Sequence, residues 1–94
     1  MKQLNSVFRK FSEIDEIILY GSRAKGNYRT GSDIDLTLKG KNLNGNLLNK
    51  INLKLDDLYL PYILDLSIYN KIKNKELIEH INRVGVKIYK KDLK

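Results

Sequence analysis

Two aspartates, Asp33 and Asp35, are the residues of this chain whose spacing best suits chemistry. They lie in the stretch Asp-Ile-Asp-Leu-Thr-Leu, an alternation typical of a half-buried β-strand. Because side chains alternate along a strand, both carboxylates are expected on one face, with their Cα atoms roughly 6–7 Å apart. Two carboxylates at that spacing can bind one hard cation, or two neighbouring ones.

The pair Gly21-Ser22 precedes these acids, separated from Asp33 by ten residues. It follows the apolar run 17–20, which is predicted to be a buried strand that glycine and serine end. The next residues, from Arg23 to Lys25, can start a helix, and a helix start presents free N–H groups that suit an anion. Small residues there would let a phosphate approach the backbone. Two roles stay open for Arg23, as a ligand of phosphate or carboxylate and as a solvated residue of a helical turn.

The run GSRAKG followed by SDIDL resembles the signature of the nucleotidyltransferase superfamily that includes DNA polymerase beta. It is most similar to the minimal nucleotidyltransferase (MNT) proteins. In that superfamily a third carboxylate stands on the strand after the next helix, and Asp65 matches this place. An isolated buried carboxylate is costly, so Asp65 needs a cation, an arginine partner or solvent. Oxygen ligands without cysteine or a second histidine favour Mg²⁺ or Mn²⁺ over zinc.

The resemblance implies a metal-dependent transfer of a nucleoside monophosphate, AMP from ATP, to a hydroxyl group. Two metal ions would be held by Asp33, Asp35 and Asp65, the last of which may double as the proton acceptor, as two-metal chemistry requires. The phosphates would lie at Gly21 and Ser22. Prokaryotic MNT proteins are commonly antitoxins that transfer AMP to a tyrosine of a HEPN toxin, so the implied partner is a HEPN toxin.

Other functions stay open at this point. The chain could be an antitoxin that neutralises its toxin by binding alone, or a nucleotidyltransferase acting on RNA or a small molecule, although such enzymes usually need extra substrate-binding structure. A basic RNA-binding module explains neither Gly21-Ser22 nor the acids. The acceptor hydroxyl is also undetermined; among the chain's own six tyrosines, Tyr28 is the best placed for self-modification.

Size and composition limit the number of domains and the cellular location that can be expected. Ninety-four residues predict one domain spanning 1–94, and 41% hydrophobic with 31% charged residues is ordinary for a globular protein. The sequence has no apolar run long enough for a membrane, no signal peptide at its start and no cysteine, which predicts a cytoplasmic protein. The net charge of +7 reflects a general lysine bias better than a nucleic-acid partner. The oligomeric state, homo- or hetero-oligomeric, is left open.

Hydrophobic periodicity predicts the elements around these residues. Helical spacing of apolar residues begins with Leu4, Val7, Phe8 and Phe11 and returns in two later segments, whereas alternation marks the strands. The predicted class is α/β (α+β), a small mixed β-sheet flanked by helices mainly on one face, and the resemblance implies the polymerase-beta-like core. Strand order and direction stay open. The expected elements are helices over 1–12, from about 47 and over 74–83, and strands over 13–20, 32–39, 62–69 and 86–89.

Overall fold

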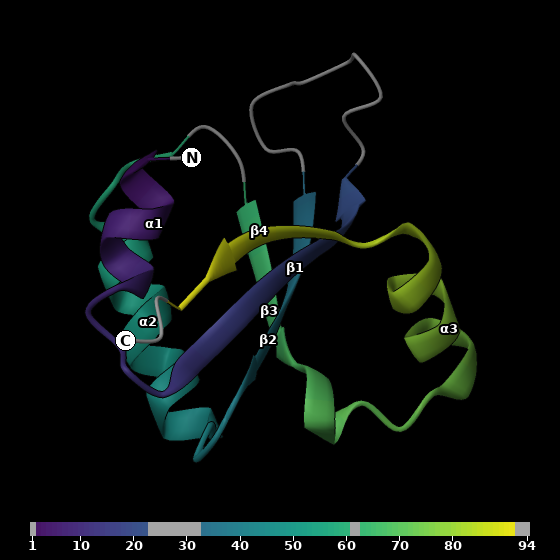
Figure 1. Cartoon of the computed structure of the whole chain (residues 1–94). Coiled ribbons are helices and arrows are strands. Elements are labelled where there is room, and N and C mark those ends of the chain that lie inside the picture. The colour runs from purple at the N-terminus through teal and green to yellow at the C-terminus, as the bar shows by residue number, and fades with distance from the viewer. Residues whose placement is uncertain (1, 23–32, 61–62, 92–94) are drawn as a thin grey trace.

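The computed structural model describes residues 2–22, 33–60 and 63–91, and all statements about structure concern these residues (Figure 1). Helices and strands alternate along most of this chain, as the apolar spacing predicts. In order, the elements are α1 (Lys2–Phe8), β1 (Ile14–Ser22), β2 (Asp33–Gly40), α2 (Gly45–Asp56), β3 (Ile63–Ile68), a 3-10 turn (Tyr69–Lys71), α3 (Lys75–Val84) and β4 (Val86–Lys90).

The four strands form one mixed sheet in the order β3-β2-β1-β4. β1 is antiparallel to both of its neighbours, β2 and β4, whereas β3 is parallel to β2. A parallel pair needs a crossover connection, and α2 lies in that connection. The predicted class, a small mixed sheet flanked by helices, is confirmed.

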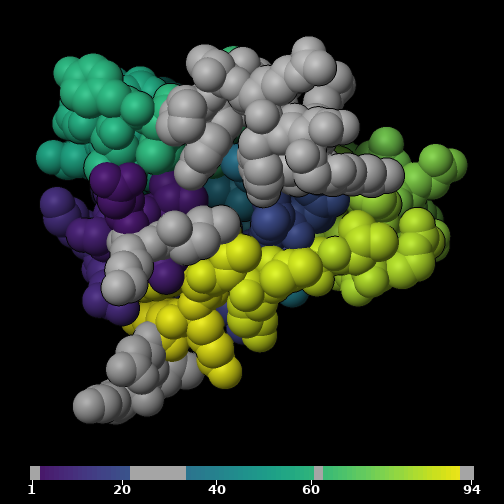
Figure 2. Space-filling model, turned by 90° about the horizontal axis from the view of Figure 1, so that it is seen from above, coloured from purple at the N-terminus to yellow at the C-terminus, as the bar shows by residue number. Residues whose placement is uncertain are grey.

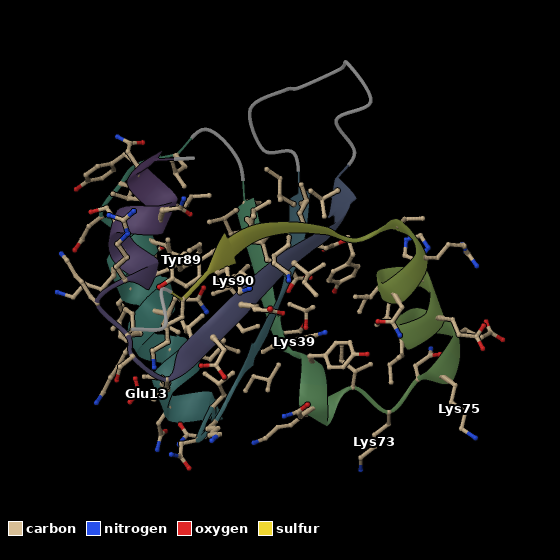
Figure 3. The ribbon with its side chains drawn as sticks, viewed as in Figure 1. Glu13, Lys39, Lys73, Lys75, Tyr89 and Lys90 are labelled. Carbon is tan, nitrogen blue, oxygen red and sulfur yellow. The ribbon has the colours of Figure 1, made fainter. Side chains whose placement is uncertain are left out.

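The main core lies between the sheet and the helices α1 and α2. Alternation along β2 places Ile34, Leu36 and Leu38 on this side, and all three are buried. Phe8 of α1 is fully buried and meets Tyr89 of β4 edge to face, with ring centroids 5.8 Å apart (Figure 3). The apolar stripes of α1 and α2 therefore cover one face of the sheet.

The third helix covers part of the opposite face. Figure 2 shows α1 and α2 together on one flank of the molecule and α3 on the other. Ile81 of α3 is buried, and the backbone at Gly85 comes so close to Ile18 of β1 that a Cβ there would collide with it. Asn74 is the N-cap of α3, and its side chain accepts hydrogen bonds from the N–H groups of Glu76 and Leu77. Two helices thus share one face, and the polar face of the sheet is only partly covered by the third.

The prediction that Gly21 and Ser22 end the first strand is wrong. β1 continues through both residues, which pair with Asp35 and Ile34 of β2. A register shift between Leu19 and Gly21 marks a β-bulge in which Tyr20 is the extra residue of β1. Beyond this bulge the ladder continues through Gly21 and Ser22. Pairing with β2 therefore outweighs the weak strand propensity of glycine. The helix expected from Arg23 lies outside the described residues.

The described helices are short: no helix among them has the length and apolar character needed to cross a lipid bilayer.

Candidate functional site

The structure brings two of the three predicted acids together. Asp35 of β2 and Asp65 of β3 are direct partners in the parallel ladder, and partners in a ladder project from the same face of a sheet. Neighbouring strands lie about 4.8 Å apart, so the two carboxylates can share a ligand. Asp65 is exposed and Asp35 is half-buried, on the face opposite the α1–α2 core.

The remaining predicted site residues are placed only in part. Asp33 begins β2, two residues before Asp35, and its backbone pairs with Ile63. The structure describes the backbone of Asp33 and of Ser22, but not their side chains, and Arg23 lies outside the described residues. Among the side chains that are described, no group of three or more histidine, cysteine or acidic residues is arranged to hold a metal ion.

Gly21 is the nearest backbone neighbour of the acid pair on β1. It stands opposite Asp35 in the antiparallel ladder, and a Cβ built on Gly21 would collide with the Asp35 carboxylate oxygen. The same Cβ would lie only 3.2 Å from Cβ and Cγ of Asp35. The close approach of the carboxylate, rather than a turn, therefore favours glycine at position 21.

Tyr20 is a site residue that sequence reasoning did not identify. Its side chain lies near Ser67 of β3 and close enough to Asp35 and Asp65 for their charges to act on its phenol. Burial is the main cause that raises the pKa of the Tyr20 phenol, the nearby Ser67 hydroxyl lowers it, and the two carboxylates raise it further. Tyr20 thus lies beside the acid pair as a neutral hydroxyl group. Its place next to the Gly-Ser pair was visible in the sequence, but its closeness to Ser67 and Asp65 depends on the order of the strands.

The same face of the sheet becomes basic toward its other end. Lys39 follows Asp35 and Thr37 on β2, and its Nζ lies 4.4 Å from the ring centroid of Tyr69 (Figure 3). On β1, Glu16 pairs with Lys87 at 3.0 Å. That hydrogen bond is the main cause that lowers the pKa of Glu16. The acids therefore lie at one end of a face whose other end carries lysines.

A larger hollow lies elsewhere on the described surface. It has a volume of about 990 Å³ and lies between α1 and β4, lined by Arg9, Phe11, Tyr89 and Lys90 among others. None of the predicted site residues lines it. The paired carboxylates of Asp35 and Asp65 lie outside this hollow, on β2 and β3.

Comparison with known proteins finds a sequence relative and solved structures that share this fold. A protein of Methanocaldococcus jannaschii named "Putative protein adenylyltransferase MJ0141" is 28% identical over 95 residues, covering 93% of this chain and 89% of the relative. Two solved structures match with a TM-score of 0.75 each, at 18% and 16% identity, and each match covers 96% of this chain and 73% of the other.

One of these is described as the crystal structure of a toxin–antitoxin with AMP-PNP. The other is a mutant of the toxin–antitoxin MntA-HpeT in which two aspartates, spaced as Asp33 and Asp35 are, are replaced by glutamate. At this identity the two structures establish the fold. The model of the family "Polymerase beta, Nucleotidyltransferase" matches residues 2–94, nearly the whole sequence. On this match, the chain belongs to the polymerase beta nucleotidyltransferase family.

Proposed function

We propose that this chain transfers AMP from ATP to a hydroxyl group, with Asp33, Asp35 and Asp65 as the acidic residues of the site. The observation that carries the proposal is the direct pairing of Asp35 with Asp65 beside the bare backbone of Gly21. Family membership supports the reaction class, and the geometry supports the choice of residues.

The donor set fits two Mg²⁺ or Mn²⁺ ions. The described pair offers carboxylate oxygens, which these hard cations prefer, and the sequence contains no cysteine to favour a softer metal. Asp33 and Asp35 would hold both ions, and Asp65 would complete the second. Bound there, the ions would neutralise phosphate charge and lower the pKa of the attacking hydroxyl.

The chain's own residues have separate roles in this proposal. Gly21 and Ser22 would bind the β- and γ-phosphates through their backbone, and Arg23 would add positive charge. The acceptor oxygen forms a bond to the α-phosphorus while the bond from that phosphorus to the β-phosphate oxygen breaks. AMP stays on the acceptor, pyrophosphate leaves, and Asp65 accepts the hydroxyl proton.

We further propose that the acceptor is a tyrosine of a partner toxin of the HEPN class, so that the chain acts as an antitoxin. The name of the M. jannaschii relative supports a protein acceptor. The descriptions of the two solved structures support a toxin partner and an adenine nucleotide. Replacement of an equally spaced aspartate pair in one of them supports a role for Asp33 and Asp35.

The test is to incubate the purified chain with labelled ATP and Mg²⁺, with and without a co-expressed HEPN toxin, and to detect AMP on either protein by mass spectrometry. Asp35→Asn and Asp65→Asn are expected to lower transfer at least a hundredfold, on the order of the several kcal/mol that metal ions contribute. Asp56→Asn, at an exposed acid that ends α2, is the matched control and keeps full transfer.

Two results would contradict this proposal. Absence of AMP from both proteins rejects nucleotidyl transfer to protein. Undiminished neutralisation of the toxin by Asp35→Asn, with complex formation retained, shows that the chain acts by binding alone.

A further inference from the structure

The hollow between α1 and β4 carries an excess of positive charge. Arg9, Lys90 and Lys91 line it, and none of its lining residues is acidic. Within the part of the chain that the structure describes, no carboxylate lies within ion-pair distance of these three cations. Lys91 instead donates from Nζ to the backbone carbonyl of Ser12, 2.9 Å away, which leaves its charge in place. The described chain therefore does not neutralise the charge of this hollow.

The floor and the rim of the hollow differ in polarity. Phe11, Ile88 and Tyr89 are half-buried and pack against the core, so they form an apolar floor. Arg9 and Lys90 are exposed, so they lie at the rim. An apolar centre with a polar rim is the usual composition of a surface that binds another protein. Exposed cations at a rim also suit a partner that covers the hollow better than a small anion enclosed within it.

A second hollow, of about 530 Å³, adjoins the first. Lys90 and Lys91 line both hollows, and the second is also lined by Asp15, Glu16, Lys39 and Lys41. Its positive charges outnumber its acids, and Glu16 is already paired with Lys87. Positive charge therefore continues from α1 around the end of β4 toward the end of β2, which suits an extended acidic segment.

The aromatic side chains of the hollow argue against a nucleic acid as the partner. Proteins bind single-stranded nucleic acids by stacking bases on aromatic side chains. Here Tyr89 meets Phe8 edge to face, and Phe11 packs against the core, so both rings already pack within the protein. A second copy of this chain is also a poor partner, because the net charge of +7 makes two copies repel each other.

We propose that the hollow between α1 and β4 binds an extended acidic segment of a partner protein. Carboxylates of that segment would lie at Arg9 and Lys90, and an apolar side chain would cover Phe11 and Ile88.

This docking surface lies away from the acid pair. Lys90 pairs with Glu16 of β1, and five residues, roughly 16 Å of strand, separate Glu16 from Gly21. A partner held at the hollow thus leaves the end of the sheet with Asp35 and Asp65 open. The inference goes beyond the proposed transfer of AMP and does not depend on it.

The test measures binding of a fluorescein-labelled peptide of glutamates interspersed with leucines, by fluorescence anisotropy and without ATP. A chain with both Arg9→Gln and Lys90→Gln is expected to bind it at least about fivefold more weakly, because two charge pairs are lost. Both residues are exposed, so the fold should be retained, which circular dichroism checks. A peptide with serine in place of leucine should bind the wild-type chain more weakly, because it leaves the apolar floor uncovered.

A chain with both Lys73→Gln and Lys75→Gln is the matched control. It loses the same charge from two exposed lysines at the side of the molecule that carries α3, away from Lys90 (Figure 3). At about 0.15 M salt, exposed charges further apart than about 8 Å are largely screened from each other, so this control should bind the peptide within about twofold of the wild type.

Several results would overturn the inference. Equal weakening by the two double variants shows that only the overall charge of the chain attracts the peptide. Tighter binding of an oligouridylate of equal charge assigns the hollow to nucleic acid, and absence of peptide binding rejects the docking surface. Equal binding of the serine peptide rejects the apolar contact. If the chain with both substitutions does not fold, Arg9→Gln alone decides. A chain that binds the peptide but transfers no AMP refutes the proposed reaction and leaves the docking surface standing.

Discussion

Asp35 lies directly opposite Gly21 across β1 and β2, and its carboxylate occupies the space that any larger residue at position 21 would fill. The carboxylate thus packs against bare backbone at the end of the sheet where Asp65 also projects. Glycine often interrupts a strand, but Gly21 lies within β1 and leaves room for the carboxylate of Asp35.

Gly21→Ala is expected to damage the site. The added methyl group must displace the Asp35 carboxylate or the strand, and overpacking of this kind costs about 1–3 kcal/mol. Nucleotidyl transfer should fall at least about tenfold, measured with labelled ATP. Gly45→Ala is the control, because a Cβ at Gly45 meets nothing within 4 Å and alanine is a better helix former. An active, stable Gly21→Ala chain would show that Asp35 need not occupy its observed position.

Tyr20 is expected to ionise late in the alkaline titration of the chain. The folded chain raises the pKa of Tyr20, so its phenol ionises at a higher pH than it does in the unfolded chain. The resulting contribution to stability is complete below the unfolded pKa of about 10 and is lost as the pH rises through the folded value. Ultraviolet absorbance of tyrosinate measures this. Tyr20→Phe should remove a component that ionises above the unfolded value, and an unchanged titration at high pH would contradict the assignment.

The ion pair between Glu16 and Lys87 should contribute little, and only above acidic pH. Its partners are 25% and 48% exposed, which limits the expected cost of Glu16→Gln to less than about 1 kcal/mol. The pKa of Glu16 is lowered in the folded chain, so the contribution is present above the unfolded pKa and disappears as the pH falls through the folded value. Urea unfolding of both chains at neutral and acidic pH measures the difference, which should not grow on acidification.

Asn74→Ala is expected to destabilise α3. The Asn74 side chain accepts hydrogen bonds from Glu76 N at 2.9 Å and Leu77 N at 3.2 Å, and loss of such an N-cap costs about 1 kcal/mol. Thermal unfolding followed by circular dichroism measures the change. Asn70→Ala, at an exposed residue of the preceding 3-10 turn, serves as the comparison and should unfold as the wild type does. Equal stabilities for the two variants would argue against the capping interaction.

Local physics made much of this fold predictable. Leu4, Val7 and Phe8 recur at helical spacing because they share the one buried face of a helix. Apolar residues alternate around Leu36 because one side of its strand is buried. Such patterns depend on neighbours in the sequence, so they identify helices and strands without knowledge of their packing. The strand end at Gly21 failed as a prediction because backbone pairing with β2, a non-local interaction, decided it.

The candidate site was predictable only in part for the same reason. The spacing of Asp33 and Asp35 is local, but the meeting of Asp35 with Asp65 depends on β3 lying parallel to β2, which no pattern in the chain specifies. The family resemblance supplied Asp65. The closeness of Tyr20 to Asp65 was missed because β2 lies between their strands, and strand order does not follow from a local pattern.

The parallel pairing of β2 and β3 also ties the meeting of Asp35 and Asp65 to the order of assembly. A chain emerging from the ribosome can form the hairpin of β1 and β2 before β3 has been made, but that intermediate has no second strand to supply an acid. A site that needs both Asp35 and Asp65, as proposed above, would therefore be complete only once β3 has paired with β2, whether or not β4 has yet paired with β1.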